Sequence, residues 1–118
     1  MSTIKEIIDR VDKSKPNCFS EERKLRWISL LDGKVAASVY RMDIVDVRRL
    51  DYTHPECLEH KPLIDFPHDD LYDLWLSAMI DFENGEYNKY QNTMEMFNSQ
   101  YYEFVRWIAE TYDPAQGG

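Results

Sequence analysis

The strongest pattern along the chain is a stripe of apolar residues in its last third. Successive members are three or four residues apart, as on one face of a long α-helix. No Pro or Gly interrupts the segment between Glu86 and Pro114. We therefore predict a helix over residues 86–112 whose apolar face packs against another helix. The members of the stripe are Tyr87, Tyr90, Met94, Phe97, Tyr101, Phe104 and Ile108.

Two segments near the start of the chain have the same helical period. The first covers residues 3–13. The second begins after Ser20, a good N-cap residue, and its period continues to about Met42. Gly33 lies inside it, at a cost of about 1 kcal/mol relative to Ala. We predict one continuous second helix; the alternative is a break at residues 31–33 that leaves two shorter helices.

A third helix is predicted to begin at residues 68–70, because acidic side chains favour a helix N-terminus. It ends at Asn84-Gly85, since Gly suits the left-handed conformation that closes many helices. The last helix follows at once, so the two must form an antiparallel hairpin. We expect the apolar stripe of the last helix to contact these residues of the third: Leu71, Leu74, Trp75, Ala78 and Phe82.

The segment between the second and third helices, residues 43–68, loses the helical period. Three prolines punctuate it, and residues 44–47 and 63–64 could be short strands. A connection of this length indicates a functional arm or a small β-hairpin. The fold class we predict is all-α: one four-helix domain over residues 1–118, with an irregular or β-hairpin arm.

Net charge is −8, and its distribution is uneven. Residues 1–64 contain 12 Lys/Arg and 11 Asp/Glu, for a net charge of +1, whereas residues 65–118 contain 2 and 11, for −9. Such a surface repels nucleic-acid phosphates, so we expect no sequence-specific nucleic-acid binding. The default interpretation is a solvated acidic face. The alternative is that the acidic half of one subunit meets the near-neutral half of another.

The sequence contains no convincing set of catalytic or ligand-binding residues. No apolar run approaches the roughly 20 residues that cross a bilayer, so we expect no membrane contact. His54, Cys57 and His60 could bind a metal, with Cys18 or His68 as a fourth ligand, but strong zinc motifs repeat a Cys/His pair. We favour a loop-packing cysteine beside two solvated histidines, and predict no metal and no cofactor.

Carboxylates gather beside His68, in the pattern that an acid–base pair would need. The simpler explanation is a helix N-terminus, which favours acidic residues without catalysis. The sequence also has no Gly-rich phosphate loop and no nucleophile elbow, so we predict that the protein is not an enzyme. The carboxylates concerned are Asp65, Asp69, Asp70 and Asp73.

Some aromatic and basic residues lie off the predicted core. Tyr and Trp are enriched at protein interfaces, and Tyr102 and Trp107 lie outside the apolar stripe of the last helix. Arg48 and Arg49 form one of the few basic clusters, in the arm. These four residues are our interface candidates.

Two segments of the chain together carry a family resemblance. The first is Lys24-Leu25-Arg26-Trp27-Ile28-x-x-Leu31-Asp32-Gly33. The second is Tyr72-x-x-Trp75-Leu76-x-Ala78-x-Ile80-Asp81-Phe82-x-Asn84-Gly85-Glu86-x-x-Lys89-Tyr90-x-Asn92-x-Met94-x-Met96-Phe97-Asn98. Both resemble a small helical protein of prophages and tailed phages of Firmicutes, placed among head–tail connectors (head-completion, adaptor or neck proteins).

The resemblance implies a non-enzymatic structural subunit of the virion. Such a subunit would assemble as a ring with copies of itself, between the portal and the tail proteins. It would be found in the host cytoplasm during assembly and afterwards in the virion. A cytosolic helical adaptor or regulator, binding a protein through an aromatic face, is the alternative.

Overall fold

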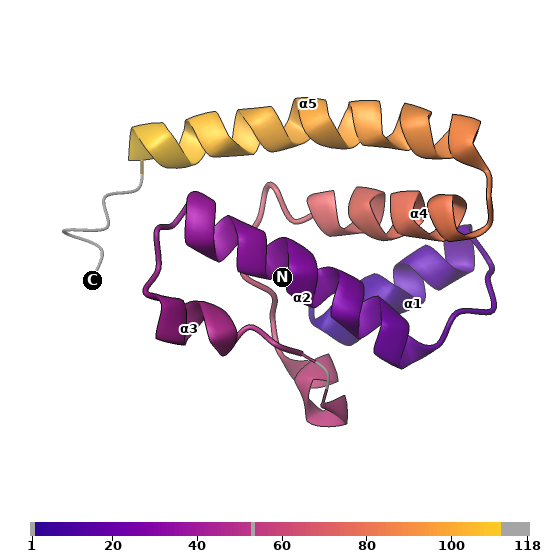
Figure 1. The fold of residues 1–118 in the computed structure, drawn as a ribbon, viewed down its shortest axis with the longest axis horizontal. Coiled ribbons are helices and arrows are strands. Elements are labelled where there is room, and N and C mark those ends of the chain that lie inside the picture. Colours follow the sequence, from indigo (N-terminus) through magenta and orange to yellow (C-terminus); the bar gives the residue numbers. More distant parts are fainter. Residues whose placement is uncertain (1, 53, 112–118) are drawn as a thin grey trace.

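The computed structural model describes residues 2–52 and 54–111, and the regular elements in this part of the chain are all helical (Figure 1). The all-α prediction is confirmed. Five α-helices are present in the described residues where four were expected, together with one 3₁₀ helix, η1. The elements are α1 (Ile4–Ser14), α2 (Glu21–Ser38), α3 (Ile44–Arg48), η1 (Pro55–Glu59), α4 (Leu71–Glu83) and α5 (Tyr87–Thr111).

The first two helices begin at hydroxyl side chains that cap them. Thr3 and Glu6 exchange hydrogen bonds between side chain and backbone in a capping box at the start of α1. The Ser20 hydroxyl accepts the N–H of Arg23 at the start of α2. As predicted, α2 passes through Gly33 without a break. It ends at Ser38, short of the expected residue 42, because the backbone turns through a left-handed conformation (φ 54°) at Arg41.

The predicted antiparallel hairpin is formed by α4 and α5. Gly85 joins them with a φ of 75°, the left-handed conformation that glycine adopts at low cost. Trp75 packs on Phe97 with ring centroids 5.4 Å apart, and Phe82 packs on Tyr90 at 5.1 Å. These contacts confirm two of the expected partners of the apolar stripe. The predicted end of the last helix, at Tyr112 and Pro114, lies outside the described residues.

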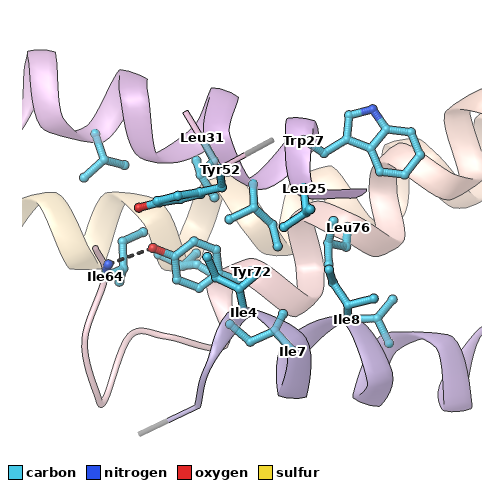
Figure 2. Packing of buried hydrophobic residues seen from close by; sticks show 14 of the residues in the cluster. Ile4, Ile7, Ile8, Leu25, Trp27, Leu31, Tyr52, Ile64, Tyr72 and Leu76 are labelled. Atoms are coloured by element: carbon cyan, nitrogen blue, oxygen red, sulfur yellow. Dashed lines mark hydrogen bonds between the residues drawn. The ribbon is translucent and has the colours of Figure 1, made fainter. Parts of the chain in front are cut away.

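The α4 helix lies at the centre of the molecule. It contacts α5 on one side and α1 and α2 on the other, so α5 forms an outer layer (Figure 1). At about 1.5 Å per residue, the 25-residue α5 is roughly twice as long as the 13-residue α4 and extends past its start. Figure 2 shows the core on the inner side of α4, where isoleucine side chains of α1 meet α2 and Tyr72 and Leu76.

The arm between α2 and α4 contains no strand in its described residues, so of the two expected forms, irregular or β-hairpin, the hairpin is not confirmed. Residues 44–47, Ile-Val-Asp-Val, were expected as a possible strand but form part of α3. A short strand requires a partner strand, whereas a helical turn satisfies its own backbone groups. The rest of the arm packs onto the core through Tyr52, Cys57 and Ile64, each at most 9 % exposed.

Candidate functional site

The most concentrated polar chemistry of the molecule is a buried carboxylate, that of Asp32 in α2. Its side chain is 0 % exposed. It accepts hydrogen bonds from the Tyr52 hydroxyl at 2.7 Å, from the backbone N–H of Leu63 at 3.0 Å and from the Tyr72 hydroxyl. The Tyr72 oxygen in turn accepts the N–H of Ile64 at 2.7 Å (Figure 2). One carboxylate thus joins α2, α4 and two stretches of the arm.

The environment of this cluster raises the pKa values of all three of its side chains. Burial raises the pKa of Asp32, while the three hydrogen bonds act in the opposite direction. Burial and the negative charge of Asp32 raise the pKa of Tyr52 and Tyr72, so both hydroxyls stay protonated and donate. Because all three side chains are at most 6 % exposed, a substrate has no access to them. The cluster is therefore suited to holding the arm in place and not to catalysis.

The sequence analysis did not single out this cluster, although a signal for it exists. Asp32 lies four residues after Ile28 and three before Val35, on the buried face of α2. A carboxylate on an apolar helix face is expected to have buried hydrogen-bond donors around it. The donors themselves come from residues 20 to 40 positions away, and only the tertiary structure identifies them.

The three candidate metal ligands lie in and beside η1. Cys57 is buried in the core, whereas His54 and His60 are exposed at the two ends of the 3₁₀ helix. Within residues 2–52 and 54–111, no three His, Cys, Asp or Glu side chains are placed where they could hold a metal ion. The backbone carbonyl of His60 accepts the N–H of Ile4, so this segment anchors the start of α1.

His68 and Asp73, two members of the candidate acid–base cluster, make separate contacts. The His68 ring lies between two aromatic rings of α5, with centroids 5.3 Å from Phe104 and 5.1 Å from Trp107. The carboxylate of Asp73 receives two hydrogen bonds of 2.7 Å from Arg10 of α1. These contacts bind helices to one another, and neither arranges a carboxylate to orient the imidazole.

The two aromatic interface candidates lie on the C-terminal half of α5. Tyr102 is 65 % exposed and Trp107 is 43 % exposed. The guanidinium of Arg106 lies 6.0 Å from the Tyr102 ring centroid. Phe66, in the connection before α4, is 75 % exposed, the largest value among the exposed large apolar residues of the described chain. Two more aromatic side chains, Phe82 and Tyr87, are 48 % and 57 % exposed. Isolated exposed apolar residues are common, whereas a contiguous apolar patch indicates an interaction site.

The two basic interface candidates lie at the end of α3, on the arm. Arg48 and Arg49 are exposed, and Arg49 makes only a surface ion pair of 3.7 Å with Asp46 of its own turn. The same helix contributes no buried residue, and its Ile44 and Val45 are 61 % and 52 % exposed. The arm therefore presents aliphatic and basic side chains together.

Some basic residues of the N-terminal half form ion pairs with acidic residues of the C-terminal half within the subunit. Three of them join the N-terminal half to α4: Arg10–Asp73 at 2.7 Å, Lys15–Asp81 at 2.6 Å and Arg23–Glu83 at 3.3 Å. The acidic residues of α5 have no such partners among the described residues of α1 and α2. The acidic excess is not concentrated on α5, whose net charge is −1 (three acidic and two basic residues); residues 65–86 contain seven acidic residues and no basic one, for −7.

Comparisons with protein-family models, with curated proteins and with solved structures found no significant match to this chain. In the described residues, no helix has the length and apolar character needed to cross a membrane.

Proposed function

We propose that this protein is a non-enzymatic structural subunit of a phage or prophage virion neck. In this role it is a head–tail connector that assembles as a ring with copies of itself, between the portal and the tail proteins. It acts through its surfaces, first in the host cytoplasm during assembly and then in the virion. The resemblance of residues 72–98 to such connectors supports the proposal. This segment covers most of α4, the turn after it and the first half of α5.

The observation that carries the proposal is the incomplete burial of α5. Only Phe97, Phe104 and Ile108 of its 25 residues are buried. The helix contacts chiefly α4, and its C-terminal half extends beyond that helix (Figure 1). A helix of this length with exposed aromatics offers more surface than its own subunit covers, which is the property expected of an assembly subunit.

The acidic surface is compatible with a ring through which DNA passes. Carboxylates repel the phosphate backbone, so a negatively charged passage does not retain the DNA that slides through it. The candidates for this role are the carboxylates of residues 65–111 that have no ion pair among the described residues: Asp65, Asp69, Asp70, Glu95 and Glu103. Phosphate-neutralising contacts would instead require basic side chains on the same surface.

Light scattering coupled to size-exclusion chromatography, over a concentration series at low and high salt, tests self-association. We expect a discrete oligomer larger than a dimer, and rings in electron micrographs of the same fraction. A protein that stays monomeric at every concentration, both alone and with a portal protein if its gene neighbourhood encodes one, would contradict the proposal.

A cytosolic adaptor that binds one partner protein is the second candidate function. The exposed rings of Phe66, Tyr102 and Trp107 favour it, since aromatic side chains are typical anchors of protein interfaces. The gene neighbourhood separates the two candidates. Portal, capsid and tail genes beside this one favour the connector, whereas unrelated metabolic or regulatory genes favour the adaptor.

A further inference from the structure

Two exposed surfaces of this subunit are complementary in charge and both carry apolar side chains. The first, here named the α3 arm, comprises residues 41–49. It contains Arg41, Arg48 and Arg49, all exposed, and the exposed apolar residues Met42, Ile44 and Val45. Its acidic residues are Asp43 and Asp46, so its net charge is +1.

The second surface, here named the α5 patch, comprises Phe66, Pro67, Asp70, Glu103, Trp107 and Glu110. A hollow of about 500 Å³ between the start of α4 and α5 is lined by Pro67, Asp70 and Glu103, among others. A second hollow of about 280 Å³ is lined by Glu103, Trp107 and Glu110, with Arg106. The two hollows lie next to each other, since Glu103 lines both.

The charge of the α5 patch is negative and largely unpaired. Among residues 2–52 and 54–111, Asp70 and Glu103 have no ion pair, and Glu110 has only a 4.0 Å contact with Arg106. The exposed Trp107 lines the second hollow beside Glu103 and Glu110, and the exposed Phe66 precedes Pro67, which lines the first. A partner for this surface should therefore carry basic groups next to aliphatic side chains, which is the composition of the α3 arm.

We propose that the α3 arm of one subunit docks on the α5 patch of the next. This inference rests on the proposed self-association and assigns it a contact. In Figure 1, α3 lies on the side of α2 away from α5, so one subunit can use both surfaces at once. A contact between two different surfaces is head to tail, and it closes into a ring when the rotation between subunits allows it. Burial of Ile44 and Val45 against the aromatic rings adds an apolar contribution that salt does not screen.

Charge reversal on each side tests the contact. The arm variant is Arg48→Glu with Arg49→Glu, and the patch variant is Glu103→Lys with Glu110→Lys. We expect each variant alone to need at least a tenfold higher concentration for half-assembly, measured by light scattering at low salt. An equimolar mixture should assemble near the wild-type concentration, because each arm then meets a patch of opposite charge. Recovery on mixing also shows that both variants are folded.

A matched control has the same change of net charge as the arm variant at a distant site, Lys13→Glu with Arg26→Glu, both exposed on α1 and α2. We expect it to assemble as the wild type does. If the control loses assembly equally, or if the arm and patch variants assemble normally, the proposed contact is wrong while self-association stands. The two surfaces would then serve other proteins. A wild-type protein that is monomeric throughout overturns the proposed self-association itself.

Discussion

Replacement of Asp32 by Ala tests the role given to the buried carboxylate. The substitution leaves three buried donors without an acceptor: the hydroxyls of Tyr52 and Tyr72 and the N–H of Leu63. Each such donor costs about 1–3 kcal/mol, or about 3–9 kcal/mol for three. The substitution also removes the desolvation penalty of the buried Asp32 charge, which offsets several kcal/mol of this loss in stability. We expect a net loss of about 3 kcal/mol in the free energy of unfolding.

This loss is a large fraction of the roughly 5–15 kcal/mol that stabilises a typical domain. Urea denaturation followed by far-ultraviolet circular dichroism measures it, and the melting temperature should fall by about 10 °C. Asp32→Asn keeps the shape and one acceptor oxygen, so we expect a smaller loss, of about 1–2 kcal/mol. Asp9→Ala is the control, because that carboxylate is exposed and its ion pair with Lys5 is 3.8 Å long.

The arm should respond to Asp32→Ala more than the helices do. The carboxylate holds Tyr52 and Leu63, on either side of η1, against α2. Hydrogen exchange should therefore accelerate first in residues 50–64. A loss of less than about 1 kcal/mol, or exchange that is unchanged in the arm, would refute the assigned role.

Three further predictions concern the stability of individual substitutions. Because burial raises the folded-state pKa of Asp32 above its ordinary 3.8, this side chain binds more protons in the folded than in the unfolded protein between these two pKa values, so it adds stability as the pH falls through that range. The cost of Asp32→Asn, measured by urea denaturation, should therefore be larger near pH 4 than near pH 7; an equal cost contradicts the raised pKa. Gly33→Ala should stabilise the protein by about 0.5–1 kcal/mol, because its site in α2 is open, whereas Gly85→Ala should cost about 1 kcal/mol, because its φ is 75°. Thermal melts of the two should shift in opposite directions. Lys15→Met should cost about 3 kcal/mol, because it leaves the buried carboxylate of Asp81 unpaired, and Lys15→Met with Asp81→Leu should recover much of the loss.

Local periodicity and end signals were sufficient to predict most of the helices. Apolar residues three and four apart place α1, α2, α4 and α5 because a helix buries one face, and this requirement is visible in a single segment. Gly85 predicts the hairpin for a similar reason, since only the turn's own backbone conformation is involved. The same reasoning failed for α3, whose five residues are too few to show a helical period.

The candidate surfaces and the buried cluster depended on tertiary structure. Tyr102 and Trp107 could be proposed as interface candidates from their place off the apolar stripe, and Arg48 and Arg49 from their basic cluster, but the sequence does not show that His68 lies against Trp107. Nor does it show which donors surround Asp32, because they lie 20 to 40 residues away. Helical period is a property of neighbouring residues and is determined by the sequence alone. Two features are decided only when the helices pack: the pairing of one buried carboxylate with two distant tyrosines, and the exposure of the C-terminal half of α5 beyond the start of α4.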